Sequence, residues 1–183
     1  MKKHIIDIFQ PAVGTPSKAL PDGAIAGNGD LTVVLAGSAD RVRIHIGKAD
    51  FWKADGRVYT EDRGGIAPLG LAEILLPQFA YAEYKAEQNL DEACITLHLT
   101  EGKRTANLKI TVCAEENTIL LALDRTHPVV SASISLLPLE GSDAVAETGS
   151  VGNVRYAIRG FDTPECRFPS YGICALKQIS RTV

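Results

Sequence analysis

The stretch AIAGNGDLTVVLAGSADRVRIHIGKADFW, residues 24–52, decides the fold that this sequence predicts. Residues 31–36 (LTVVLA) form a short, apolar and β-branched run bounded by glycines, which is typical of a buried strand. Residues 41–48 alternate, with Val42, Ile44 and Ile46 on one face and Arg41, Arg43, His45 and Gly47 on the other. Residues 37–40 between them have the composition of a hairpin turn. The stretch therefore predicts two antiparallel strands.

Short apolar or alternating runs recur through the rest of the chain at a spacing of roughly ten residues, which favours an antiparallel all-β sandwich. Residues 79–88 fit either a helix or a strand, and the spacing of Phe79, Tyr81 and Tyr84 favours a strand. No convincing amphipathic helix is found. The predicted strands lie at residues 4–9, 31–36, 41–48, 71–76, 79–88, 94–99, 108–112, 118–123, 129–137, 154–159 and 173–179.

Length and composition predict one well-buried domain spanning residues 1–183, since the chain has 183 residues and is 45% hydrophobic. Within it, residues 1–23 are an irregular lead-in that can include an edge strand. Residues 24–136 form the core, and residues 137–183 are closing strands richer in glycine and proline. The chain ends in or just after a strand, as if short relative to a larger architecture.

Charge and hydropathy exclude some classes of partner. The net charge is −3, and the lysines and arginines are scattered, so we expect no nucleic-acid partner. No apolar run approaches the ~18 residues needed to span a bilayer, so we expect no membrane association. The N-terminus begins like a signal peptide, but Asp7 interrupts its apolar part and no small-residue cleavage site follows. We therefore expect a cytoplasmic protein.

The cysteines give no sign of a metal or redox site. Cys94, Cys113, Cys166 and Cys174 lack any CxxC spacing, which argues against zinc and against a redox pair. Buried free thiols are the expected state. We predict no metal and no cofactor.

Several segments, taken in order, resemble the N-terminal β-domain of glycoside hydrolase family 95, the α-L-fucosidase-like enzymes. A GNG turn precedes a buried strand, and an alternating strand ends in a tryptophan. In place of the family's usual Asn-Glu-Asp before that tryptophan stands GKAD, so the chain resembles a divergent relative. The matching segments are Gly27–Gly29, Ile44–Trp52, Pro68–Leu71, Tyr84–Ala93 and Ala114–Thr118, with the apolar run that follows.

The resemblance implies a supersandwich, in which two large antiparallel sheets lie face to face, similar to galactose mutarotase and to the N-domains of family 65 phosphorylases. In the family, the catalytic residues belong to an α/α toroid that follows this domain, and nothing helical follows here. We therefore expect no catalytic residue in this chain. The implied function is a non-catalytic carbohydrate-associated domain that supports the toroid and lends the loop 50–63 to sugar binding.

Candidate sugar-binding residues are Asn28, Asp30, Asp50, Trp52 and Arg63. An exposed indole would stack on the apolar face of a sugar, and amide or carboxylate groups would accept hydrogen bonds from its hydroxyls. Each residue also has a structural interpretation. Asn28 and Asp30 fit turn chemistry, the loop carboxylates fit solvated charges, and Phe51 and Trp52 fit the end of the sandwich core.

Two further functions stay open. A free-standing sugar mutarotase or epimerase would need a histidine acid and a glutamate base, and His45, His98 and His127 are available. His45 and His98 are expected on the polar faces of strands, where a solvated imidazole is ordinary. The other alternative is a structural or oligomerising β-domain without a ligand. An unpaired strand edge near Val183 predicts a homo-oligomer.

Overall fold

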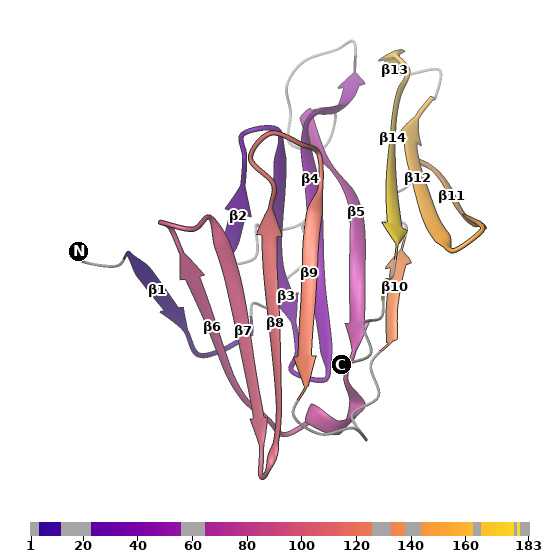
Figure 1. The fold of residues 1–183 in the computed structure, drawn as a ribbon. Coiled ribbons are helices and arrows are strands. Elements are labelled where there is room, and N and C mark those ends of the chain that lie inside the picture. Colours follow the sequence, from indigo (N-terminus) through magenta and orange to yellow (C-terminus); the bar gives the residue numbers. More distant parts are fainter. Residues whose placement is uncertain are drawn as a thin grey trace. The chain divides into compact units, whose positions relative to one another are not determined.

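The computed structural model describes residues 4–11, 23–55, 65–125, 133–137, 144–162, 166–177 and 179. Within these residues helical structure is limited to the 3-10 turn η1 (Pro77–Phe79), and the rest of the regular structure is β-strand (Figure 1). The prediction of an antiparallel all-β fold is therefore confirmed. Contacts divide the chain into two compact units, residues 1–45 with 73–134 (unit 1) and residues 46–72 with 135–183 (unit 2).

The first sheet belongs to unit 1 and has the strand order β1-β6-β7-β8-β9. Every pairing in it is antiparallel. Alternation places Ile95, Leu97 and Leu99 of β7 on one face, opposite Ile110, Leu108 and Ala106 of β8, and all six are at most 2% exposed. Its strands are β1 (Ile5–Ile8), β6 (Glu83–Asn89), β7 (Cys94–Glu101), β8 (Arg104–Val112) and β9 (Ile119–Arg125).

The second sheet has the strand order β10-β5-β4-β3-β2, and β13 pairs with β4. Strands β2 and β3 contact β7 and β8, so the core of unit 1 lies between two sheets, with Val33, Val42 and Ile44 fully buried. Its strands are β2 (Ile25–Gly27), β3 (Leu31–Gly37), β4 (Arg41–Asp55), β5 (Gly65–Leu75), β10 (Ser133–Leu137) and β13 (Cys166–Phe168).

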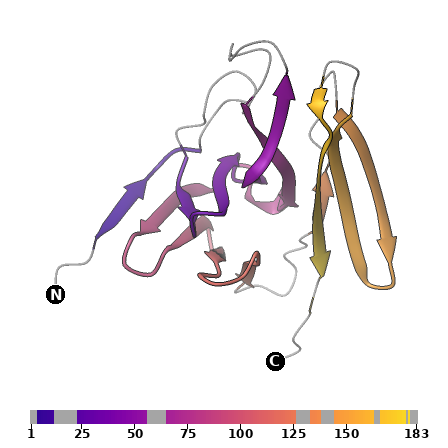
Figure 2. The same ribbon diagram turned by 90° about the horizontal axis from the view of Figure 1, so that it is seen from above.

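The third sheet belongs to unit 2 and consists of β11 (Ala144–Val151), β12 (Val154–Phe161) and β14 (Ser170–Lys177), in that order. Figure 2 shows these strands side by side at the orange and yellow end of the colour scale. Both pairings are antiparallel. One face is buried: Ala157 and Phe161 are 3% and 4% exposed, and Cys174 is 9% exposed.

The structure corrects several sequence expectations. Strand β4 continues to Asp55, so Asp50–Asp55 is strand and not the start of a loop. Residues 79–82 are not strand, because Phe79 ends the 3-10 turn with its side chain fully buried and Tyr81 lies in the following turn, 91% exposed. Strand β11 was not predicted, because its sequence AVAETGSV does not alternate. The predicted residues 129–132 lie outside the described residues.

Candidate functional site

The C-terminal half of β4 places Phe51 and Trp52 on opposite faces of the strand. Phe51 is 2% exposed, and its ring stacks on Phe161 of β12 with the centroids 5.4 Å apart. Trp52 points the other way and is 40% exposed. Its indole Nε1–H donates to the carbonyl oxygen of Ala49 at 2.6 Å. The buried neighbour and this hydrogen bond hold the indole in place while part of its surface meets solvent.

Asp50 shares a face of β4 with Trp52, since the two residues are two apart on one strand. Its carboxylate forms an ion pair with Lys48, with Nζ and Oδ1 2.8 Å apart. The side chain of Asp50 is 73% exposed, so this pair contributes little to stability. The carboxylate, the ammonium group and the indole therefore form a small polar and aromatic surface.

Asn28 and Asp30 lie together in the turn before β3, in unit 1. The Asn28 side-chain oxygen accepts the backbone N–H groups of Asp30 and Leu31 at 2.9 and 2.7 Å. Its amide nitrogen donates to the carbonyl oxygens of Cys113 and Glu116 at 2.8 and 3.4 Å. Both polar atoms of Asn28 are thus used to fix the turn against the loop after β8. A role for Asn28 and Asp30 in sugar binding stays a prediction.

The structure brings Asp50 and Trp52 together in unit 2, and Asn28 and Asp30 together in unit 1. Arg63 lies outside the described residues, and so does His127.

Arg159 is a buried cation that the sequence analysis missed. It is 8% exposed, its Nη1 donates to the carbonyl oxygen of Pro68, and its guanidinium carbon lies 5.2 Å from the centroid of the Phe161 ring. Its Nε has no hydrogen-bond partner among the described residues. Burial lowers the pKa of the guanidinium. Arg159 occupies an inward position of β12 between Ala157 and Phe161. The alternation of residues 157, 159 and 161 along the strand is the sequence pattern from which its burial could have been predicted.

His45 is buried, which corrects the expectation of a solvated imidazole. It is 8% exposed, and its Nδ1 has no hydrogen-bond partner among the described residues. Burial, and secondarily the charge of Arg43, lower its pKa from the ordinary value of 6.5. The guanidinium of Arg43 is itself paired with Glu73, with Nε and Oε2 3.0 Å apart. A neutral imidazole is therefore the favoured form.

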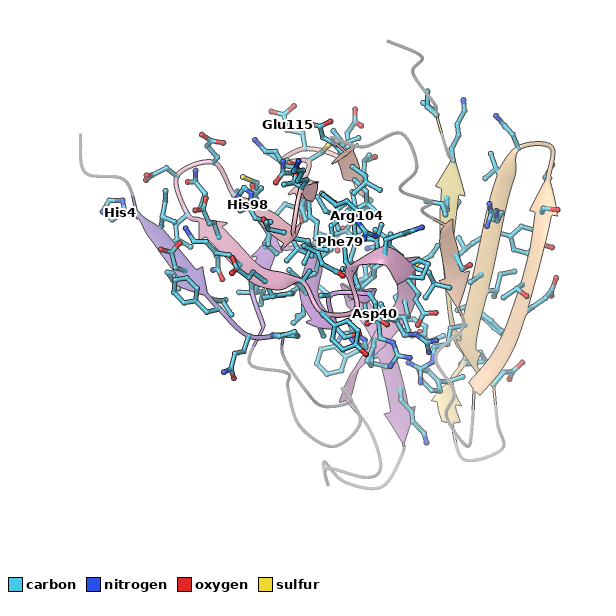
Figure 3. All side chains as sticks on the ribbon, turned by 90° about the horizontal axis from the view of Figure 1, so that it is seen from below. His4, Asp40, Phe79, His98, Arg104 and Glu115 are labelled. Carbon is cyan, nitrogen blue, oxygen red and sulfur yellow. The ribbon has the colours of Figure 1, made fainter. Side chains whose placement is uncertain are left out.

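His98 belongs to a ladder of polar side chains across β1, β6, β7 and β8, on the face opposite the core of the first sheet. Figure 3 labels His98. Its Nδ1 lies 2.8 Å from the side-chain oxygen of Asn107, and its Nε2 lies 3.6 Å from Oε2 of Glu87. Lys85 binds Glu87 and Asp7 at 2.6 and 3.3 Å. These contacts lower the pKa of Glu87, chiefly through the hydrogen bond from Lys85.

Three further observations concern metals, thiols and membranes. In the part of the chain that the structure describes, no group of three His, Cys, Asp or Glu side chains is placed to hold a metal ion.

Cys94, Cys113 and Cys174 are free, and Cys94 and Cys174 are buried. Burial raises the pKa of the Cys174 thiol to about 11. None of the helical structure among the described residues is long and apolar enough to cross a bilayer.

Comparison with known proteins gives no identification. No family model matches the chain, and no curated protein matches it. The class that the fold defines is an antiparallel all-β protein.

Proposed function

We propose that this chain is a non-catalytic, carbohydrate-associated β-domain that presents Trp52 to a saccharide. The observation that carries the proposal is the state of Trp52: the indole is 40% exposed while its N–H is bound to Ala49. An indole fixed in this way offers a flat apolar surface at little entropic cost, which suits the C–H face of a pyranose. Asp50 on the same face supplies an acceptor for sugar hydroxyls.

The finer fold that accompanies this proposal is the supersandwich of glycoside hydrolase family 95. Its support is the order of the segments that resemble the family and the pair of facing sheets in unit 1. The partner that this fold implies is a helical α/α toroid carrying the catalytic residues. On this view the function of the chain is to support that domain and to contribute to sugar binding through β4 and the segment after it.

The test uses the intrinsic fluorescence of the protein, because Trp52 is the only tryptophan. Titration with L-fucose, D-galactose and fucosyllactose is expected to shift or quench its emission in a saturable way. Calorimetry on Trp52→Ala is expected to show at least a tenfold weaker affinity, whereas Trp52→Phe retains an apolar ring and most of the affinity. Unchanged emission and equal affinities of Trp52→Ala and the wild type would contradict the proposal.

A sugar epimerase is the second candidate, and the observation that favours it is the approach of His98 to Glu87, 3.6 Å between Nε2 and Oε2. A histidine acid and a glutamate base are the groups that anomer exchange requires. The measurement is the rate of anomer exchange of galactose by NMR. An epimerase would lose its rate enhancement in His98→Ala, and a wild-type protein that matches the uncatalysed rate would remove this candidate.

A further inference from the structure

The sheet β11–β12–β14 has one buried face and one exposed face, and the exposed face is aromatic and aliphatic. The strand register places Ile158 opposite Ile173, Tyr156 opposite Ala175, and Tyr171 opposite Gly160. Tyr171 and Ile173 are 55% and 61% exposed. These side chains point away from the face that contains Ala157, Phe161 and Cys174. We call Tyr156, Ile158, Tyr171 and Ile173 the tyrosine strip.

The ring of Tyr156 lies against a glycine of the neighbouring strand. Its register partner on β11 is Gly149, and a Cβ atom added to Gly149 would stand 2.5 Å from the Tyr156 hydroxyl oxygen and 2.6 Å from Cζ. The hydroxyl donates to Oε1 of Glu147 at 3.2 Å. Glu147 is two residues from Gly149 on the same face of β11. The ring therefore packs against the backbone of Gly149, and the carboxylate of Glu147 holds its hydroxyl group.

Tyr171 repeats this arrangement on the other side of β12. Its register partner is Gly160, and a Cβ atom there would stand 2.3 Å from Cδ1 of the Tyr171 ring and 2.7 Å from Cε1. The hydroxyl donates to the carboxylate of Asp162, which directly follows β12 and is two residues from Gly160. Two tyrosines on two strands are thus held by the same combination of a facing glycine and a carboxylate two residues away.

The repetition places two ordered rings on one face of the sheet. Tyr156 and Gly160 are four residues apart on β12, so the two ring positions are separated by about 13 Å along the strand. Ile158 and Ile173 are register partners between these two positions. Because each ring is already held by its packing against a glycine and by its hydrogen bond to a carboxylate, the side chain loses little further conformational entropy when a ligand binds.

We propose that the tyrosine strip binds a neutral oligosaccharide, with the sugar rings stacked on Tyr156 and Tyr171 and their hydroxyls donating to Glu147 and Asp162. This goes beyond the proposal for Trp52, since it concerns other residues and shares only the class of ligand. Tyrosine faces match the C–H faces of pyranoses, and exposed carboxylates accept hydrogen bonds from hydroxyl groups. A strip of this length fits several linked sugar units better than a single one.

The charges of the strip argue against two other occupants. Glu147 and Asp162 stand at the hydroxyl ends of the two rings, so a nucleic acid would bring its phosphates close to carboxylates. Among the described residues on this face of the three strands, Lys177 is the single cation. A second copy of this chain seated face to face would bury these exposed carboxylates, which carries a high desolvation cost. A neutral ligand rich in hydroxyl groups carries no phosphates to repel the carboxylates, and its hydroxyl groups donate hydrogen bonds to them.

The experiment is a glycan array followed by calorimetry on the intact chain, with cellohexaose, xylohexaose and maltohexaose as probes. We expect saturable binding of at least one neutral oligosaccharide, about tenfold or more weaker in Tyr171→Ala and in Tyr156→Ala. Tyr171→Phe keeps the ring and should stay within about threefold of the wild type. The matched control is Tyr81→Ala, which removes a tyrosine that is 91% exposed but lies in a turn of unit 1.

The outcomes separate this inference from the proposal for Trp52. Loss of binding in the Tyr171 and Tyr156 variants with full binding in Trp52→Ala supports the strip alone. Loss in Trp52→Ala with full binding in both tyrosine variants supports the Trp52 site and overturns the strip. An array with no binding overturns both. A dimer by sedimentation that Tyr171→Ala converts to a monomer, without oligosaccharide binding, would identify a second copy as the occupant. Circular dichroism of each variant establishes that it is folded.

Discussion

At the scale of single residues, Asn28 shows how one side chain joins two distant segments. Its oxygen accepts two N–H groups of its own turn, and its nitrogen donates to the carbonyl oxygens of Cys113 and Glu116. Asn28→Ala removes these four hydrogen bonds, and of the four backbone groups the Glu116 carbonyl keeps the N–H of Thr118 as a second partner. We expect the free energy of unfolding to fall by about 1–3 kcal/mol in urea denaturation.

Asn89→Ala is the matched control for Asn28→Ala. The Asn89 oxygen also accepts two backbone N–H groups of its own turn, those of Asp91 and Glu92 at 3.0 and 3.1 Å. No long-range hydrogen bond of its side chain is seen among the described residues. Its loss should therefore cost less. Equal losses in the two variants would show that the bonds of Asn28 to the loop after β8 contribute nothing.

His45 predicts a dependence of stability on pH. Its pKa is lowered in the folded protein from the ordinary value of 6.5, mainly by burial and then by the charge of Arg43. Below about pH 6.5 the unfolded chain binds the proton more readily than the folded one, so protonation favours unfolding. We expect the free energy of unfolding to decrease as the pH falls from 7.5 to 5.5, and this slope to be smaller in His45→Gln.

His4→Gln is the control for this titration. His4 is an exposed histidine before β1, with Nδ1 3.0 Å from the carboxylate of Asp91 (Figure 3). The substitution removes a histidine without changing the surroundings of His45, so the part of the pH slope that His45 contributes should remain in this variant. If the free energy of unfolding depends on pH equally in His45→Gln and in the wild type, the pH dependence comes from groups other than His45.

At the scale of elements, the β3–β4 hairpin was predictable from the sequence, whereas the full length of β4 was not. Residues 31–48 alternate or are apolar because one face of each strand lies in the core of unit 1. Farther along β4 the burial pattern changes: Ile44, His45 and Ile46 are all buried, and the next buried residue is Phe51. Residues 47–50 between them are half-buried or exposed and carry no alternating apolar residues, so periodicity alone ended the strand too early.

The same limit applies to the candidate sites. Trp52 could be selected from the sequence, because it is the only tryptophan and stands next to a polar segment. Arg159 and the tyrosine strip could not be selected, since their surroundings depend on which residues of β11, β12 and β14 face one another. Gly149 and Tyr156 face each other although they are 7 residues apart in the sequence, and Gly160 and Tyr171 face each other although they are 11 residues apart. Register is therefore the missing information.

The β3–β4 hairpin also provides a test of its turn. Gly37 has φ +97°, and a Cβ atom there would stand 2.2 Å from the carbonyl oxygen of Arg41. Gly37→Ala therefore meets both an unfavourable backbone conformation and a clash with backbone. We expect a loss of about 2 kcal/mol or more in the free energy of unfolding, measured by circular dichroism in urea.

Gly102→Ala in the β7–β8 hairpin separates the two causes. Gly102 also has a positive φ, +63°, but no atom lies within 4 Å of an added Cβ. This variant should lose only about 1 kcal/mol, the cost of the left-handed conformation. A Gly37→Ala variant no less stable than Gly102→Ala would mean that the turn relaxes away from the Arg41 carbonyl.

At the scale of the whole molecule, central and outer strands differ in how their backbone is protected. Strand β8 lies between β7 and β9, and its inward residues Ala106, Leu108 and Ile110 are at most 1% exposed. Strand β11 is the outer strand of its sheet and pairs with β12 alone among the described residues. The outward N–H groups of such a strand are open to solvent, or to a strand of another molecule.

Hydrogen exchange at residue resolution should follow this difference. We expect the amides of β8 to exchange slowest and those of β11 that face away from β12 to exchange fastest, because exchange requires a broken hydrogen bond. Strand β9 is a control within unit 1, as the outer strand next to β8. The predicted homo-oligomer adds a second test. If it forms through β11, the outward amides become protected as protein concentration rises, and equal exchange at all concentrations excludes this edge as the interface.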